Sequence, residues 1–148
     1  MITGINYDIC MTQSRIYRYV AQCRYDIKRF SDAFLTSDFC RRAFDTLYSR
    51  FQLEDVFECM DFIVPEIQSD LVKASGLVFD EDVAAWIGFI YRQLYIETEV
   101  KSSRLVTVVK FQTLCNYYAG LHTVDLEDAT DIICRDFRME KAVRSETD

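Results

Sequence analysis

The chain has 148 residues, half of them apolar, and a formal net charge of −7 at pH 7. This length suits one domain with a sizeable core, and four glycines and one proline leave little material for linkers or disordered tails. The longest apolar run, nine residues at 83–91, is too short to cross a bilayer, and the first ten residues do not read as a secretory signal. The sequence therefore predicts a cytoplasmic protein without membrane contact.

Charge is distributed unevenly along the chain. Residues 1–52 contain eight Lys/Arg and five Asp/Glu, whereas residues 53–148 contain nine and nineteen. An acidic protein repels nucleic-acid phosphates. The charge therefore disfavours nucleic acid as a partner and suits a basic protein better.

The chain opens with a predicted amphipathic helix over about 14–34, with Ser14 as its N-cap and residues 1–12 frayed. Apolar residues recur there every three or four positions, as on one face of a helix. They are Ile16, Val20, Cys23, Ile27, Phe30 and Phe34. The other faces of this helix carry basic residues, which form either a patch for an anionic partner or an ordinary solvated face. We favour the solvated face.

Two shorter helices follow. One, over about 38–50, would place Phe39 and Leu47 on a common apolar face. The other opens at 53–55 and is interrupted by Pro65, which lacks a backbone donor and disfavours helical geometry in the preceding residue. We expect a kink there, or a new helix with proline at its first position.

The next helix is predicted to be the central one. Gly76 breaks the chain, and Asp80 then caps a helix whose apolar residues occupy two neighbouring stripes over 83–95. Such a wide apolar surface is typical of a buried helix. Gly88 would let another helix approach closely, and Trp86 would anchor the core.

The segment 102–118 supports two readings. The β-branched residues at 105–109 are typical of a strand, but no turn residue interrupts the segment and its apolar spacing fits a helix. We favour a helix that ends at Gly120.

A last helix starts at Asp125 and carries a common apolar face up to Phe137. The tail, about 139–148, is expected to fray. The predicted fold of residues 1–148 is thus all-α, a single-domain bundle of six or seven helices.

The only histidine, His122, lies in the segment YYAGLHTVDLEDATD, residues 117–131. With Asp125 as N-cap, Asp128 falls at the third helical position, as in a capping box, so we interpret the segment as a helix start. Cys115 and His122 have the residue types of a nucleophilic pair, but a cysteine on an apolar face is usually inert because burial raises its pKa. A contact with a partner, or a catalytic role for His122, is the alternative.

Metal and cofactor chemistry find little support. The six cysteines include no Cys-x-x-Cys pair, a single histidine cannot form a zinc-binding His pair, and the four glycines form no phosphate-binding loop. Most of the cysteines are expected to be reduced and to act as small core residues. We predict no metal, no cofactor and no catalytic residue.

Three segments carry a resemblance: SDFCRRAFDTLYSRFQ, WIGFIYRQLYIETEVKSSRLV and YYAGLHTVDLEDATD. They resemble a family of small helical proteins from gut-type Firmicutes and related bacteria. Residues 83–137 also resemble a shorter domain of unknown function with a similar Tyr-x-x-Leu-His-Thr stretch. Such domains tend to lie beside genes for ADP-ribosyltransferase-like proteins, an arrangement that suggests toxin–antitoxin pairs. The matching residues are Tyr91, Arg92, Ser102, Ser103, Tyr118, His122 and Thr123.

These observations favour a non-enzymatic protein-interaction module, whose specific version is the antitoxin or immunity partner of a basic cytosolic toxin. The alternatives are a nucleic-acid-binding regulator that uses the basic 15–29 helix and an enzyme centred on His122. Homo-oligomerisation is left open. The candidate interaction residues are Arg15, Arg18, Arg29, Arg41, Arg42, Tyr91, Arg92, Tyr118, His122 and Thr123.

Overall fold

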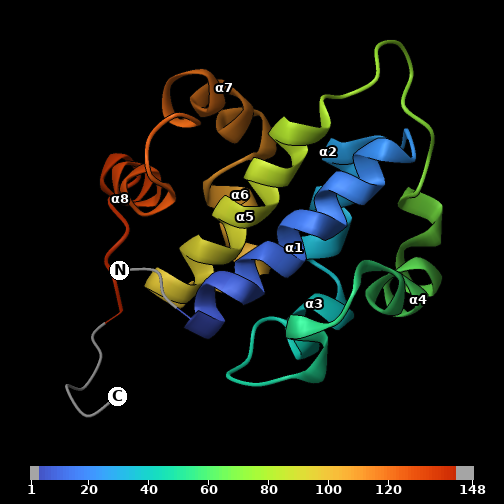
Figure 1. The fold of residues 1–148 in the computed structure, drawn as a ribbon, viewed down its shortest axis with the longest axis horizontal. Coiled ribbons are helices and arrows are strands. Elements are labelled where there is room, and N and C mark those ends of the chain that lie inside the picture. The colour runs from blue at the N-terminus through green and yellow to red at the C-terminus, as the bar shows by residue number, and fades with distance from the viewer. Residues whose placement is uncertain (1–3, 143–148) are drawn as a thin grey trace.

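The structure, a computed structural model, describes residues 4–142 (Figure 1). Within these residues it contains two 3₁₀ helices, η1 (Arg50–Leu53) and η2 (Gln68–Asp70), and the only β pairing is one isolated bridge between Tyr25 and Lys73. The α-helices of this part are α1 (Gly4–Gln22), α2 (Ile27–Leu35), α3 (Asp38–Ala43), α4 (Val56–Ile67), α5 (Glu81–Thr98), α6 (Ser102–Val108), α7 (Phe111–Leu121) and α8 (Leu126–Asp136). The prediction of an all-α bundle is confirmed. The described part has eight α-helices rather than six or seven, because two of the expected helices are each divided in two.

Helices α1 and α5 run side by side through the middle of the molecule (Figure 1). They touch at Gly88, where a Cβ atom would stand 2.7 Å from Cγ of Tyr17. Two side chains of α1 also donate hydrogen bonds to carbonyl oxygens of α5, Gln13 to Gly88 at 3.0 Å and Ser14 to Ala85 at 2.8 Å. The predicted close approach at Gly88 is confirmed. Trp86, also in α5, is only 7% exposed, as expected of a core anchor.

The single helix predicted over 14–34 is wrong, because the chain leaves the helix after Gln22 and starts a new one at Ile27. Arg24 adopts a left-handed φ of 64°, and the Asp26 side chain accepts a hydrogen bond from the Arg29 N–H to cap α2. Ser14, expected to be the N-cap, lies inside α1 instead. The apolar spacing continues across the break because both helices bury their stripe in the same core.

Helix α3 ends at Ala43, seven residues before the predicted end near residue 50. The chain turns there because Asp45 points inward, where its carboxylate bonds to Arg92 and Ser102. As a result Leu47, expected on an apolar helix face, is 82% exposed in the following loop.

Helix α4 begins with Asp55 as its N-cap and runs through Pro65 to Ile67. Of the two expected outcomes, a kink or a new helix at residue 65, the new helix is not formed. Instead α4 continues for two residues beyond the proline, and the chain then tightens into η2. Pro65 therefore lies in the last turn of α4, where it removes only the backbone hydrogen bond that residue 65 would donate to the Asp61 carbonyl oxygen, and the helix ends soon afterwards.

The segment 102–118 is helical rather than a strand, but it divides into α6 and α7 at Val109 and Lys110. The Tyr91 hydroxyl, buried in α5, donates to the Val109 carbonyl oxygen at 2.6 Å. That hydrogen bond gives a buried hydroxyl the partner it requires and fixes the chain where the two helices meet.

Residues about 1–12 and 139–148 were expected to fray. Where the structure describes them, both segments form backbone hydrogen bonds. Residues 4–12 belong to α1. Residues 139–142 are not helical, yet the Ala142 N–H donates to the Glu97 carbonyl oxygen at 2.8 Å and so joins the chain to α5. Residues 1–3 and 143–148 lie outside the described part. No helix among the described residues is long and apolar enough to cross a membrane.

Candidate functional site

The predicted interaction residues do not form one surface. They are spread over α1, α2, α3, α5, α7 and the turn between α7 and α8. Tyr91 and Arg92 are fully buried, so their assignment to an interaction surface is wrong. The physical reason is that both side chains point into the core from α5 and find their polar partners there.

Arg92 is the centre of a buried polar network. Its Nε donates to Gln13 at 2.8 Å, its Nη1 to Oδ1 of Asp45 at 2.7 Å and its Nη2 to the Ser102 hydroxyl at 2.9 Å. Asp45 also accepts hydrogen bonds from the Ser102 hydroxyl at 2.6 Å and the Ser102 N–H at 2.8 Å. The guanidinium carbon lies 5.1 Å from the Tyr95 ring centroid.

This network joins α1, the end of α3, α5 and the start of α6. A buried ion pair contributes little net stability, but removal of one partner leaves an uncompensated buried charge. Because Arg92 and Asp45 are buried and bond to each other and to Ser102, the network positions helices.

The basic residues Arg18 and Arg29 are paired with carboxylates. Arg18 Nη1 lies 3.0 Å from Glu81 and 2.7 Å from Asp82, both at the start of α5. Arg29 Nε lies 3.0 Å from Asp70 in η2. The division of the predicted helix also places Arg18 and Arg29 on different elements, so the basic 15–29 helix of the nucleic-acid hypothesis is not a continuous surface.

Arg41 and Arg42 share the carboxylate of Asp38, which lies one turn earlier in α3. Of the predicted basic residues, only Arg15 lacks an ion pair within residues 4–142. The charges of Arg18, Arg29, Arg41 and Arg42 are thus balanced locally, which weakens the attraction that these residues could exert on a phosphate backbone.

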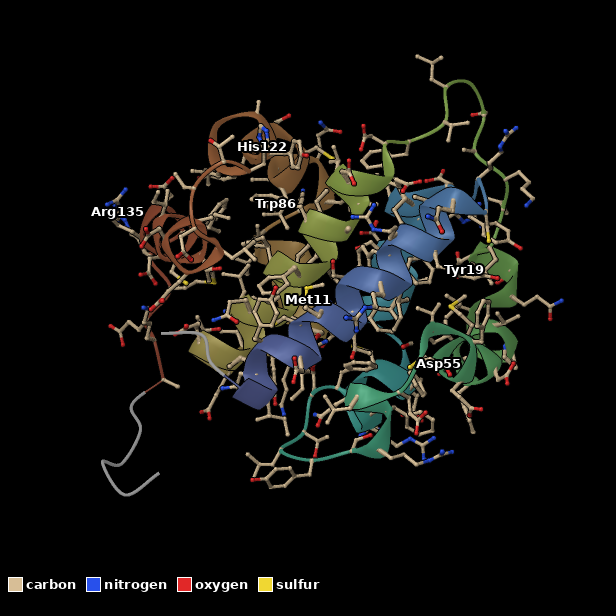
Figure 2. All side chains as sticks on the ribbon, in the orientation of Figure 1. Met11, Tyr19, Asp55, Trp86, His122 and Arg135 are labelled. Carbon is tan, nitrogen blue, oxygen red and sulfur yellow. The ribbon has the colours of Figure 1, made fainter. Side chains whose placement is uncertain are left out.

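His122 closes the end of α7. Its Nδ1 lies 2.7 Å from the Tyr118 carbonyl oxygen, and its ring stacks on the Tyr118 ring at 4.4 Å between centroids. A carbonyl oxygen only accepts hydrogen bonds, so Nδ1 is the protonated nitrogen. In a second contact, the Tyr118 ring meets the Trp86 ring edge-on at 5.5 Å between centroids. Figure 2 shows His122 farther from the middle of the molecule than Trp86. Thr123 is exposed in the turn that follows.

The start of α8 agrees with the helix-start interpretation of this segment. Asp125 is the N-cap, and its side chain accepts a hydrogen bond from the Glu127 N–H at 2.9 Å. Helix α7 ends at Leu121, one residue after the predicted stop at Gly120. His122 therefore lies in the turn between two helices, as predicted, and bonds to a neighbouring backbone group.

Burial makes Cys10, Cys40 and Cys115 poor nucleophiles, because it disfavours the thiolate. Burial raises the pKa of Cys10 to about 12 and that of Cys40 to about 11, and burial also raises the pKa of Cys115. No hydrogen bond joins Cys115 to His122 in the described part of the chain. Residues 4–142 also contain no group of three His, Cys, Asp or Glu side chains that could hold a metal ion.

Five of the ten large apolar side chains that are exposed in the described part of the chain lie between residues 47 and 62. Leu47, Tyr48, Leu53, Phe57 and Phe62 are 82%, 80%, 56%, 65% and 48% exposed. Two of them, Phe57 and Phe62, lie on α4, at the edge of the molecule away from α7 and α8 (Figure 1).

Helix α4 has two distinct sides. Its buried side carries Cys59, Met60, Ile63 and Ile67. Its outward side carries five exposed residues that we call the α4 face: Phe57, Glu58, Asp61, Phe62 and Pro65. At a helical turn of 3.6 residues, the two phenylalanines form the edges of this face and the two carboxylates lie between them.

Each phenylalanine of the α4 face is held by an aromatic neighbour. Phe57 meets the Tyr19 ring edge-on at 5.3 Å between centroids, and Phe62 meets the Phe51 ring at 4.8 Å. The Arg50 guanidinium lies over the Phe51 and Phe62 rings, at 4.4 and 5.8 Å. The two rings are therefore fixed in position while most of one and about half of the other stay in solvent.

The segment of the chain that contains α4 is strongly acidic. Residues 51–72 contain six Asp/Glu and no Lys or Arg. Glu66 accepts two backbone N–H groups at the start of α3, and Asp70 pairs with Arg29. Glu58 and Asp61 form no ion pair within residues 4–142, so the α4 face presents unpaired negative charge between its aromatic rings.

The α4 face was not predicted from the sequence, because regular apolar spacing in this segment marks only the buried side of the helix. Phe57 and Phe62 fall outside the stripe of Met60, Ile63 and Ile67. Aromatic residues off the apolar stripe and next to acidic residues are the signal that could have indicated this surface. Figure 2 places His122, which the sequence singled out, and Asp55, which caps α4, on opposite sides of the molecule.

Comparison with known proteins gives no relative: no family model, no curated protein and no solved structure matches the chain. The resemblance to antitoxin-like domains therefore rests on the sequence motifs alone.

Proposed function

We propose that the protein is a non-enzymatic protein-interaction module that works in the cytoplasm through the α4 face. The observation that carries the proposal is the exposure of Phe57 and Phe62 on a rigid helix. Exposed aromatic side chains beside polar residues are typical of the centre of protein interfaces. A helix that is already ordered loses little conformational entropy when it binds.

The alternatives have weaker support. A nucleic-acid-binding role would use Arg15, Arg18 and Arg29, of which the last two are paired with carboxylates. An enzyme centred on His122 would need a nucleophile or a second acid–base group beside the imidazole. The His122 ring instead stacks on Tyr118 and bonds to its carbonyl oxygen.

The specific version of the proposal follows the sequence resemblance: the partner is a basic cytosolic toxin, and this protein is its antitoxin or immunity protein. A net charge of −7 supports this version, because an acidic protein complements a basic partner and speeds their encounter. If it holds, co-expression of this protein with the partner should restore growth to cells that the partner alone arrests.

The test is capture from a lysate of the native cells at low salt, with the wild type, Phe57→Ser and Leu77→Ser used in parallel. Leu77 is a matched control because it is an apolar residue, 96% exposed, in the loop before α5. We expect a stoichiometric protein that the wild type and Leu77→Ser capture and that Phe57→Ser loses. Identical eluates from all three proteins would overturn the proposal that the α4 face binds a protein.

A further inference from the structure

The α4 face also indicates what kind of partner fits it. We propose that it binds a basic amphipathic α-helix of the partner protein, with apolar side chains against Phe57 and Phe62 and Lys or Arg side chains paired with Glu58 and Asp61. This inference rests on the proposed function and specifies the partner's chemistry.

The geometry of the face suits a helix. The described residues contain no strand edge to which an extended peptide could add. Phe57 and Phe62 are five positions apart, a rise of about 7.5 Å along α4, and a helix with its side chains is about 10–12 Å wide. A single helix packed on α4 would therefore cover both rings, as two helices do when their side chains interlock.

The charges of the face suit a basic helix. Glu58 and Asp61 lie between the two rings, so any partner that covers the rings also removes these carboxylates from water. Burial of a carboxylate without a partner is costly, and a Lys or Arg in hydrogen-bond reach offsets that cost. The helix dipole explains Glu58, in the first turn of α4, but it does not explain Asp61, nearly a turn further along.

A second copy of this chain fits poorly as the occupant. Around a two-fold axis the same residues meet each other, so Glu58 and Asp61 of one copy would face Glu58 and Asp61 of the other. Like charges placed together across an interface are repulsive. The nearest basic side chain, Arg50, already lies over the rings of Phe51 and Phe62 at one edge of the face.

The experiment uses the full chain and two synthetic helices of about 18 residues, long enough to form in water. One carries Leu along one face and Lys along the other, and its matched version carries Glu in place of each Lys. Fluorescence anisotropy measures the affinity of each helix for the wild type. We expect the Lys helix to bind about 10-fold tighter than the Glu helix, and its advantage to shrink in high salt.

A charge swap provides the decisive variant. Glu58→Lys with Asp61→Lys should reverse the preference, so that the Glu helix binds more tightly. Asp128→Lys with Glu140→Lys changes the net charge equally at exposed positions, one in the first turn of α8 and one beyond its end, and should keep the wild-type preference. Phe57→Ser should weaken the Lys helix about 10-fold, because an interface aromatic typically contributes that much.

Three outcomes would overturn the inference: equal binding of the two helices, an unchanged preference in the Glu58/Asp61 variant, or a reversed preference in the control variant. Sedimentation that shows a wild-type dimer, lost in Phe57→Ser, would also overturn it by naming a second copy as the occupant. If the lysate capture succeeds and the helices fail, the interaction module stands and only the basic-helix inference falls. If Phe57→Ser and Leu77→Ser both still capture the same protein as the wild type, the proposed function of the α4 face is wrong, and the basic-helix inference that rests on it is wrong too.

Discussion

Two regions of the molecule place polar and apolar groups in opposite ways. One is the contact between α1 and α5, and the other is the outward side of α4. Between α1 and α5, polar side chains are buried and each has a partner, as Gln13 does with both Arg92 and the Gly88 carbonyl oxygen. On the α4 face, aromatic rings are exposed and carboxylates are unpaired within the described residues. The first region is complete in itself, whereas the second has groups that a partner could satisfy.

The difference shows where stability and binding reside in this molecule. Satisfied buried polar groups fix the arrangement of helices, and loss of one partner is costly because the other stays buried. Exposed rings add little to folding, since most of their area stays in water. Changes at the two regions should therefore separate stability from binding.

The largest effect on stability is expected from Arg92→Met. The change leaves the Asp45 carboxylate buried without its counter-ion, and we expect a loss of about 3–5 kcal/mol in the free energy of unfolding. Urea denaturation measures it. Combination with Asp45→Leu should recover part of the loss, because the orphaned charge is then gone. A double variant whose loss equals the sum of both single losses would contradict coupling between the two residues.

The next effect concerns the closest approach of α1 and α5. Gly88→Ala places a Cβ 2.7 Å from Tyr17 Cγ, and this overpacking should lower the free energy of unfolding by about 1–3 kcal/mol. Gly120→Ala is the matched control, because a Cβ there meets nothing within 4 Å. Gly120 lies inside α7, so its replacement should stabilise the protein by about 0.5–1 kcal/mol. Equal effects at the two glycines would show that the helix contact is looser than described.

A smaller effect should appear at alkaline pH. Burial raises the pKa of Cys10 from 9.0 to about 12 and that of Cys40 from 9.0 to about 11. The unfolded thiols lose their protons first, so the stability from these groups is complete below pH 9 and is lost between pH 9 and about 12. Urea midpoints measured in reducing buffer across that range should fall. Cys10→Ala should show a shallower fall than the wild type, and an identical slope would rule out a contribution from Cys10.

The smallest effect on stability is expected on the α4 face. Phe57 is 65% exposed, so Phe57→Ser should change the free energy of unfolding by no more than about 0.5 kcal/mol. Thermal and urea unfolding of Phe57→Ser and Leu77→Ser should therefore give similar values, although only Phe57→Ser is expected to lose binding. A loss of several kcal/mol at Phe57 would instead place this ring in the folding core.

The sequence predicted those parts of the fold that depend on residues close together in the chain, such as helix caps. The N-caps Asp80 and Asp125 and the central helix between 81 and 98 follow from residues close in sequence. The breaks at 23–26 and 109–110 do not, because distant groups hold them. The Asp26 N–H donates to the Val72 carbonyl oxygen at 2.8 Å, and Tyr91 donates to Val109. Periodicity continues across both breaks and therefore conceals them.

The candidate site was less predictable than the fold. His122 and Thr123 were correctly placed in a turn, because Asp125 marks the start of the next helix. Tyr91 and Arg92 were expected at a surface, yet burial of an arginine depends on a carboxylate that arrives from Asp45, 47 positions away. The exposure of Phe57 and Phe62 depends on which side of α4 the other helices cover, and the only local indication is that both rings lie off the buried apolar stripe.

The pairing of α1 with α5 also constrains the order in which the chain can fold while it is synthesised on the ribosome. The hydrogen bonds that join them connect residues 59 to 83 positions apart, so α1 is synthesised well before its main neighbour exists. Until α5 emerges, α1 can pack on α2, η1 and α4, and the buried network around Arg92 cannot form. Pairing at such sequence separation slows folding relative to bundles of adjacent helices. Nascent chains that stop before residue 98 should therefore expose Ile16 and Val20 to chaperones and proteases.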